Sequence, residues 1–233
     1  MTDAAYNTRR SELETYFDKS AKDNWIAMTS KAPINAIRRT VRAGRDQMRT
    51  ELLSWLPEDL TGARLLDAGC GTGMFAIEAA KRGADVLAVD LSPGLIDVAR
   101  ERTSEENLSG SIDYRAGDMT DPSFGAFDYI IAMDSFIHYQ FDNLVDLIST
   151  FAARTRNRLL FTVAPKTALL TLMHASGQLF PRSNRSPAIV PVSQRALIHA
   201  ANTQARLADF EIGRVRHISS AFYQSKAVEL LRG

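Results

Sequence analysis

Three glycines and an aspartate between residues 65 and 73 are the residues best placed to do chemistry in this chain. The run Leu-Leu-Asp-Ala-Gly-Cys-Gly-Thr-Gly has the pattern of a buried strand, a tight turn and the start of a helix. Glycine at every second position (Gly69, Gly71 and Gly73) leaves no Cβ where a nucleotide-like ligand would lie against the backbone. Asp67 suits a ligand with a cationic group and would repel a pyrophosphate.

The glycine spacing separates this run from two common nucleotide-binding loops. A dinucleotide fingerprint places its third glycine one position later, where this chain has Met74, and no Gly-Lys-Ser/Thr of a phosphate-binding loop follows. The run resembles instead the E/D-x-G-x-G-x-G loop of class I S-adenosylmethionine-dependent methyltransferases. A glycine turn in another kind of α/β protein is the alternative. Cys70 occupies a small-residue position inside the loop, and we include it in the predicted cofactor site.

Two more acids end the next two predicted strands. Asp90 closes the apolar run 85–90, where a carboxylate can accept hydrogen bonds from both ribose hydroxyls, a feature shared with NAD enzymes. The methyltransferase resemblance implies that Asp118 binds the adenine amino group and that Met119 covers the ring, although Asp118 alone could be a turn residue. The joint pattern predicts an S-adenosylmethionine site, which we complete with Leu91 and Met133.

Composition is ordinary for a globular enzyme. The 233 residues are 45% hydrophobic and 24% charged, with a formal net charge of +1 that gives no field to recruit nucleic acid or an anionic membrane. One cysteine excludes an intramolecular disulfide, and four histidines without metal-ligand spacing predict no protein metal site. We see neither a signal peptide nor a membrane-spanning run, so we expect a cytoplasmic protein with at most peripheral membrane contact.

Strand and helix patterns alternate from residue 61. The predicted strands lie near 63–67, 85–90, 111–115, 127–133 and 158–163, with helices near 74–82, 94–103 and 142–154. This order predicts a Rossmann-like, mostly parallel sheet with helices on both faces and ligands at its carboxyl edge. Residues 9–29 and 34–56 have helical patterns, and 210–218 and 221–230 are typical of two strands joined by a tight turn.

We divide the chain into four parts. These are an N-terminal helical lid (1–57), a cofactor-binding core (58–164), a substrate cap inserted after the fifth strand (165–192) and a C-terminal part of the core with a terminal hairpin (193–233). In the cap, an apolar helical pattern precedes Arg182 and Arg185. This suits a flat hydrophobic ligand with carboxylates, because arginine pairs with a carboxylate bidentately. A helix that packs on the core beside two solvated arginines is the alternative.

A narrower resemblance covers nearly the whole chain. The stretches 16–18, 40–49, 133–139, 161–165 and 179–187 resemble magnesium-protoporphyrin IX O-methyltransferases of bacteriochlorophyll biosynthesis. This resemblance implies a seven-stranded class I sheet ending in an antiparallel hairpin. It also implies methyl transfer from S-adenosylmethionine to a propionate of magnesium protoporphyrin IX, giving the monomethyl ester. The expected partner is the porphyrin-binding subunit of magnesium chelatase, and the magnesium belongs to the substrate.

The implied reaction requires residues that orient the substrate. A propionate with a pKa near ~4.5 is ionised at neutral pH, so no strong general base is needed. His138, beyond the fourth strand, is predicted to bond the propionate or approach the porphyrin magnesium. Tyr16, on the lid, is predicted to place its hydroxyl over the reacting oxygen, and we add Phe17 and Asp134 to the substrate site. Without the resemblance, His138 is an ordinary loop histidine and Tyr16 a core residue.

Two other functions fit part of this pattern. A methyltransferase of another small apolar acceptor, such as a quinone phenol or an amine, would share the cofactor residues and differ in the cap. A noncatalytic porphyrin carrier would have no need of Asp67, Asp90 and Asp118. A nucleic-acid methyltransferase is disfavoured, because the chain has no basic stripe and no Asn/Asp-Pro-Pro-Tyr/Phe/Trp motif.

Overall fold

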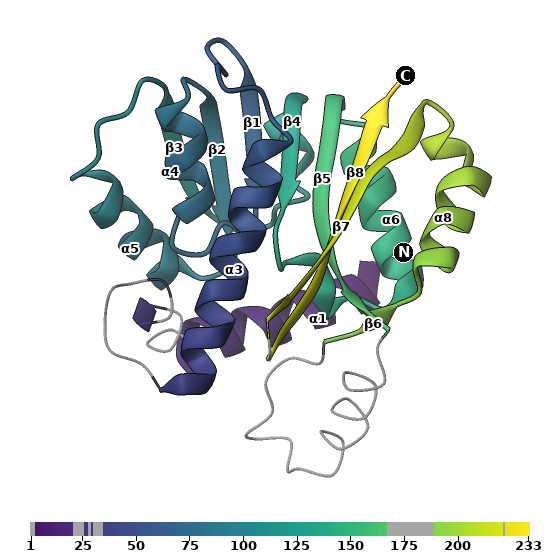
Figure 1. Cartoon of the computed structure of the whole chain (residues 1–233), viewed down its shortest axis with the longest axis horizontal. Helices are drawn as coiled ribbons and strands as arrows, with labels where there is room; N and C mark the ends of the chain where they lie inside the picture. The colour runs from purple at the N-terminus through teal and green to yellow at the C-terminus, as the bar shows by residue number, and fades with distance from the viewer. Residues whose placement is uncertain (1–2, 21–25, 28, 30–34, 167–188, 221) are drawn as a thin grey trace.

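A twisted sheet forms the centre of the protein (Figure 1). The computed structural model describes residues 3–20, 26–27, 29, 35–166, 189–220 and 222–233. The strands are β1 (Arg64–Ala68), β2 (Asp85–Asp90), β3 (Ser111–Ala116), β4 (Phe127–Ala132), β5 (Thr155–Pro165), β6 (Pro191–Val192), β7 (Phe210–Ser220) and β8 (Tyr223–Arg232). Seven of them follow the order β3-β2-β1-β4-β5-β8-β7, and β6 pairs with β5 beside that path.

The strand directions confirm the predicted mostly parallel sheet. β1 pairs in parallel with β2 and β4, and β8 runs antiparallel between β5 and β7 as the predicted terminal hairpin. The strand order reverses between β1 and β4, the position at which such sheets open a ligand crevice at their carboxyl edge. The predicted seven strands are supplemented by β6, whose two residues are too few to show an alternating pattern.

Helices cover both faces, as predicted. The α-helices are α1 (Asp3–Thr15), α3 (Ala36–Ser54), α4 (Met74–Lys81), α5 (Pro93–Thr103), α6 (Phe141–Ala152) and α8 (Gln194–Thr203). Short turns are η1 (Tyr16–Ser20), η2 (Pro122–Phe124), η3 (Phe136–His138) and η5 (Ala205–Leu207). Side chains of α3, α4 and α5 pack in one buried cluster, and those of α1, α6 and α8 pack in the other. Alternation along the strands separates the clusters: Leu65 belongs to one and Leu66 to the other.

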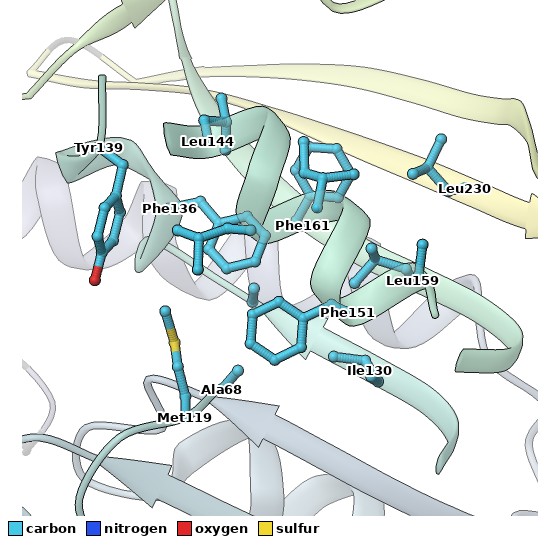
Figure 2. Packing of buried hydrophobic residues seen from close by; sticks show 14 of the residues in the cluster. Ala68, Met119, Ile130, Phe136, Tyr139, Leu144, Phe151, Leu159, Phe161 and Leu230 are labelled. Carbon is cyan, nitrogen blue, oxygen red and sulfur yellow. The ribbon is translucent and has the colours of Figure 1, made fainter. Parts of the chain in front are cut away.

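Three phenylalanine rings lie close together in the buried cluster that includes side chains of α6 (Figure 2). The Phe136 ring centroid lies 5.5 Å from that of Phe151 and 5.8 Å from that of Phe161, and all three side chains are fully buried. Phe136 belongs to the turn η3, which follows β4. The core therefore anchors the segment that carries His138.

The structure differs from the helix predictions in two places. The predicted helix 9–29 begins earlier, at Asp3, and its α-helical geometry ends at Thr15, where the π-helical turn η1 follows. Buried Tyr6 and Leu13 pack α1 against the core, and an apolar repeat this sparse gives a weak sequence signal. Helix α8 was not predicted, although Leu197, Ala200 and Ala201 are buried at helical spacing. The predicted cap helix lies outside the described residues.

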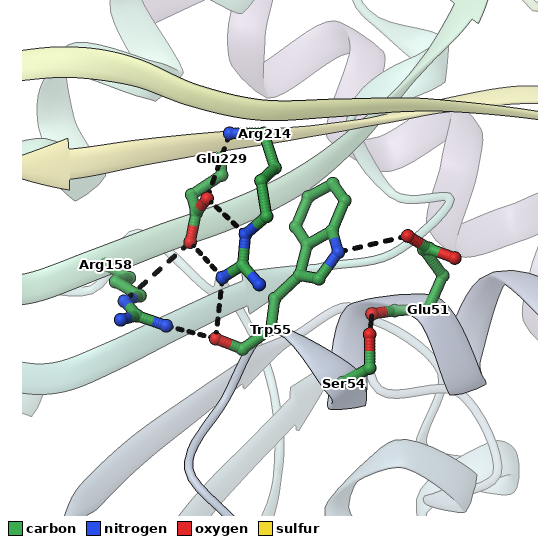
Figure 3. A network of polar contacts seen from close by, with 6 residues as sticks. All are labelled: Glu51, Ser54, Trp55, Arg158, Arg214 and Glu229. Carbon is green, nitrogen blue, oxygen red and sulfur yellow. Dashed lines mark hydrogen bonds and ion pairs between the residues drawn. The ribbon is translucent and has the colours of Figure 1, made fainter.

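Helix α3 is fixed to the sheet at its C-terminal end (Figure 3). Buried Glu229 of β8 accepts hydrogen bonds from Arg214 of β7 at 2.6 and 2.7 Å and lies 3.7 Å from the guanidinium of Arg158. Arg214 and Arg158 both donate to the carbonyl oxygen of Trp55, the residue that ends α3. Earlier in α3, Gly44 packs against the ring of Tyr223. These contacts set the position of a helix that contributes one face to the site described below.

Candidate active site

A cavity of about 440 Å³ lies at the carboxyl edge of the sheet. Its volume is within the range of small-molecule sites. The glycine loop, the segments after β2, β3 and β4, one face of α3 and the N-terminal segment all contribute to the wall. Among the predicted site residues, those in the wall are Asp67, Gly69, Cys70, Gly71, Asp90, Leu91, Met119, Met133, Asp134, His138 and Phe17.

The glycines of the loop meet two different structural requirements. All three have positive φ, at 84° for Gly69, 55° for Gly71 and 76° for Gly73. A Cβ on Gly69 would lie 2.5 Å from Ser135, and one on Gly73 would lie 2.3 Å from the Tyr114 hydroxyl, so these two positions need close packing. A Cβ on Gly71 would meet no described atom within 4 Å. Gly71 is therefore the position where a ligand can approach the backbone, whereas Gly73 begins α4 outside the cavity wall.

Asp67 is a buried carboxylate that lacks a full set of partners. Its side chain is 2% exposed, and its Oδ2 atom has no hydrogen-bond partner among the described residues. Burial, reinforced by the charge of Asp90, raises the pKa of Asp67 to about 7. A buried carboxylate with one oxygen left without a partner, in a cavity wall, fits a ligand with a cationic group, such as the ammonium of an amino acid.

Asp90 is held in place by the backbone of its neighbours. The amide of Gly71 donates to its Oδ2 at 2.8 Å, and the amide of Ser92 donates to its Oδ1 at 3.0 Å. Burial raises the pKa of Asp90, while these hydrogen bonds oppose the shift. The fixed carboxylate keeps lone pairs that can accept hydrogen bonds from the hydroxyls of a ribose, and ribose binding by Asp90 stays a prediction.

Asp118 contacts the N-terminal helix. Its carboxylate accepts hydrogen bonds from the Tyr6 hydroxyl at 2.6 Å, the Arg10 guanidinium at 2.8 Å and the Thr120 hydroxyl at 2.7 Å. Partial burial raises the pKa of Asp118, but these donors outweigh it and leave the pKa below its usual value. Asp118 does not line the cavity, whereas Tyr6 and Met119 do. Its role toward adenine stays a prediction, and it requires adenine to share this carboxylate with Tyr6.

The sequence analysis missed the face that α3 presents to the cavity. Arg42, Arg45, Asp46 and Arg49 all line it, at the i, i+3, i+4 and i+7 spacing of one helical stripe. Arg42 donates to the Ala27 carbonyl at 2.5 Å, Arg45 lies 2.9 Å from Asp134, and Arg49 lies 2.8 Å from Asp46. The spacing of these arginines places them on one face of the helix, but a polar face of this kind is usually exposed to solvent and does not by itself predict a binding site.

The segment after β4 brings His138 to the cavity. The His138 side chain is mostly buried, its ring centroid lies 5.7 Å from that of Phe17, and its carbonyl accepts a hydrogen bond from Arg9 at 2.8 Å. Tyr16 is half-buried with its ring 5.2 Å from that of Phe17, and burial raises the pKa of its phenol. Tyr16 does not line the cavity. Its catalytic role stays a prediction.

The remaining predicted groups concern the cap, a metal and the membrane. Arg182 and Arg185 lie outside the described residues. In the described part of the chain, no three His, Cys, Asp or Glu side chains form a group that could hold a metal ion. A search of those same residues finds no helix with the length and apolar character needed to cross a bilayer.

Comparison with known proteins identifies relatives over the full length. Residues 132–232 match the family model of the magnesium-protoporphyrin IX methyltransferase C-terminus, and residues 65–158 match that of a methyltransferase domain. The chain is 44% identical over 225 residues to the magnesium-protoporphyrin O-methyltransferase of Rhodobacter capsulatus, covering 96% of this chain and 97% of that protein. The ubiquinone biosynthesis O-methyltransferase of Xanthomonas oryzae is 35% identical, but over only 58% of this chain and 53% of its own length.

A solved structure extends the likeness to three dimensions. The crystal structure of magnesium protoporphyrin IX methyltransferase from Synechocystis PCC 6803 with bound SAH superposes with a TM-score of 0.83. It is 26% identical to this chain, and the alignment covers 96% of this chain and all of that one. The similarity thus includes the terminal hairpin and the N-terminal helices as well as the glycine loop. The chain belongs to the magnesium-protoporphyrin O-methyltransferase family of class I S-adenosylmethionine-dependent methyltransferases.

Proposed function

We propose that this protein transfers a methyl group from S-adenosylmethionine to a propionate carboxylate of magnesium protoporphyrin IX, giving the monomethyl ester and S-adenosylhomocysteine. The observation that carries the proposal is one continuous cavity wall that includes both His138 and Asp67, whose Oδ2 atom has no hydrogen-bond partner among the described residues. One end suits a cationic cofactor, and the other presents a side chain able to orient a carboxylate. Membership of the family supports the choice of acceptor.

The residues present fit the amino acid end of the cofactor. That end carries an ammonium and a carboxylate on one carbon, so its site needs an anion and a cation. Asp67 supplies the anion. Arg49 is our choice for the cation, because its contact is with the half-exposed Asp46 one helical turn earlier, a pair worth only ~0.5 kcal/mol. A cofactor carboxylate can share or replace that contact at little cost.

The rest of the cofactor site follows from the strand ends. Asp90 receives the ribose hydroxyls, and the open backbone at Gly71 allows close approach of the ligand. Met119 and Leu91 add apolar wall. When bound, S-adenosylmethionine supplies an electrophilic methyl group on a sulfonium sulfur.

The chain's own residues need to orient the acceptor and exclude water. A propionate is already ionised at neutral pH, so His138 acts through a hydrogen bond from its imidazole that aligns the carboxylate oxygen with the methyl carbon. Phe17 packs beside His138 and, with Leu13, covers this end of the cavity with apolar surface. Tyr16 stays our second candidate for contact with the acceptor, and Arg182 and Arg185 are our candidates for its carboxylates.

Delivery of the substrate is part of the same proposal. Magnesium protoporphyrin is poorly soluble, so we expect the porphyrin-binding subunit of magnesium chelatase to hand it over, in the cytoplasm or at the membrane surface. The expectation is tested by comparing turnover on free porphyrin with turnover on porphyrin bound to that subunit. Direct transfer predicts a rate that stays constant when excess apo-albumin is added to trap free porphyrin.

The first experiment is incubation of the protein with S-adenosylmethionine and magnesium protoporphyrin IX, with the ester detected by chromatography and mass. Monomethyl ester formed in proportion to S-adenosylhomocysteine supports the proposal. Cofactor binding without ester would favour another acceptor, such as a quinone phenol, since the ubiquinone biosynthesis O-methyltransferase matches 58% of this chain. Porphyrin binding without cofactor binding would favour a carrier.

A substitution tests the role of His138. His138→Ala should lower kcat by at least about tenfold, because orientation of the acceptor is lost, and should change cofactor affinity less than about threefold. The matched control is His217→Ala, which removes an exposed imidazole on β7, outside the cavity wall. Equal activity of the two variants would remove His138 from the mechanism.

A further inference from the structure

Asp134 has a backbone conformation that is uncommon for residues other than glycine. Its φ of 56° makes it the one non-glycine residue with positive φ in the part of the chain that the structure describes. The left-handed region is unfavourable for a residue with a side chain, and it persists where the surroundings hold it in place. Asp134 directly precedes the segment that leads to His138.

Three elements hold the Asp134 side chain. The carboxylate is 5% exposed and lies 2.9 Å from the guanidinium of Arg45 on α3. The Tyr223 hydroxyl of β8 donates to it at 3.0 Å, and the Thr162 hydroxyl of β5 donates at 3.2 Å. The backbone amide of Asp134 donates in turn to the Thr162 hydroxyl oxygen at 2.7 Å. Side chain and backbone are therefore fixed together.

The turn at Asp134 determines where the following residues lie. Ser135 packs against the glycine loop so closely that a Cβ on Gly69 would lie 2.5 Å from its own Cβ. The turn η3 follows and places His138 in the cavity wall. The amide of Val190 donates to the Ile137 carbonyl at 2.8 Å, which connects this segment to the C-terminal end of the predicted cap. A change of backbone conformation at Asp134 would shift Ser135 relative to Gly69 and move His138.

We infer that Asp134 is a positioning residue for the methyl transfer proposed above, on which this inference rests. Its carboxylate, bound by Arg45, Tyr223 and Thr162, stabilises the left-handed turn that aligns His138 with the cofactor loop. Asp134 acts through His138 and does not bind the porphyrin or exchange a proton. This assignment differs from the substrate-binding role expected from the sequence.

Two substitutions of Asp134 distinguish the effect of its backbone conformation from the effect of its carboxylate. Asp134→Asn keeps the shape of the side chain and tolerates positive φ, but it loses the charge that pairs with Arg45. Asp134→Gly keeps the backbone conformation available and loses every side-chain contact. Both should lower kcat by about tenfold to a hundredfold, the glycine variant more, because a misplacement of about 1 Å can have that effect. The KM for porphyrin and the cofactor Kd should each change less than about threefold.

The donors provide a second test and a control. Tyr223→Phe removes one hydroxyl donor and should lower kcat in the same direction, but by less. Tyr129→Phe removes a phenolic hydroxyl from β4, outside the cavity wall, and should leave kcat unchanged. Combining Asp134→Asn with Arg45→Gln removes both partners of the ion pair. The double variant should lose less activity than the product of the two single losses, because both single substitutions break the same ion pair.

Each outcome supports or overturns the inference. A rise in porphyrin KM at constant kcat would show that Asp134 binds substrate, and a lower Tm with unchanged kcat per folded molecule would show a purely structural role; either result overturns it. A readout independent of the acceptor is hydrogen exchange of the amides in 135–139 with S-adenosylhomocysteine bound. Exchange should be faster in both Asp134 variants than in the wild type. If the wild type forms no ester, the proposed function fails, and unchanged exchange would separately refute the positioning role.

Discussion

The buried carboxylate of Asp67 makes the empty protein less stable as pH rises. Below about pH 4 this carboxyl is protonated in both the folded and the unfolded state. Between about pH 4 and pH 7 the unfolded chain releases the proton while the folded protein keeps it, because burial and the charge of Asp90 raise the pKa of Asp67 to about 7. The folded state therefore loses stability through this interval, and the loss is complete just above pH 7.

Substitution by asparagine measures this effect. Asp67→Asn is neutral at every pH, so its own packing cost is the same at pH 5 and pH 8. Two pH units at 1.36 kcal/mol each imply that the wild type loses about 3 kcal/mol relative to the variant between these two values. Urea unfolding of the wild type and of Asp67→Asn at both pH values, without cofactor, gives the four free energies of unfolding that the comparison needs. Asp97→Asn, on the exposed face of α5, is the matched control and should show no such change.

Cofactor should reverse the effect. Its ammonium lies beside Asp67 in our proposal and stabilises the ionised form, so saturating S-adenosylmethionine should remove the pH-dependent loss from the wild type. Affinity for the cofactor should rise from pH 6 to pH 8 with release of a proton, which calorimetry in buffers of different ionisation enthalpy detects. A difference between wild type and Asp67→Asn that stays constant from pH 5 to pH 8 would refute the reasoning.

Two further predictions concern the N-terminal segment and α3. Tyr6→Phe removes the hydroxyl that donates to Asp118 at 2.6 Å, so S-adenosylhomocysteine should dissociate several-fold faster in stopped-flow measurements. An unchanged dissociation rate would argue against a role of the contact between α1 and Asp118 in retaining the ligand. Gly44→Ala would place a Cβ 2.5 Å from Cδ1 of Tyr223, and the displacement of α3 should lower the free energy of unfolding by about 1–3 kcal/mol. A loss below about 0.5 kcal/mol in urea titration would contradict the close packing.

The sheet and its cofactor edge were predictable because the signals are local. Short apolar runs separated by helical patterns specify strand, helix and order, and the acids at the run ends then fall on one edge. Asp67, Asp90 and the glycines were found in this way, and the structure places Asp67, Asp90, Gly69 and Gly71 in one cavity wall. The hairpin was predictable for the same reason, since its two strands are adjacent in the chain.

The missing parts of the site depend on contacts between distant residues. Tyr6 and Asp118 are separated by 112 positions. No periodicity in the sequence indicates that the Tyr6 hydroxyl donates to the carboxylate that we predict to bind adenine. The arginines of α3 have the spacing of an ordinary polar face, and contacts with distant residues, such as Gly44 against Tyr223 and the Trp55 carbonyl with Arg214, place α3 with these arginines at the cavity. The positive φ of Asp134 likewise follows from Arg45 and Tyr223, not from its sequence neighbours.

We propose that the N-terminal segment couples cofactor exchange to its own docking. Asp18 accepts hydrogen bonds from Ser92 and Gly94 after β2, Tyr6 and Arg10 bind Asp118 after β3, and Arg9 binds the His138 carbonyl after β4. Each of these loops also contributes to the cofactor or acceptor site. Because Tyr6, Leu13 and Phe17 form part of the cavity wall, undocking of the segment removes that wall and exposes the ligand. In this proposal, release of S-adenosylhomocysteine breaks these contacts, and docking around a new cofactor restores the wall and the position of His138.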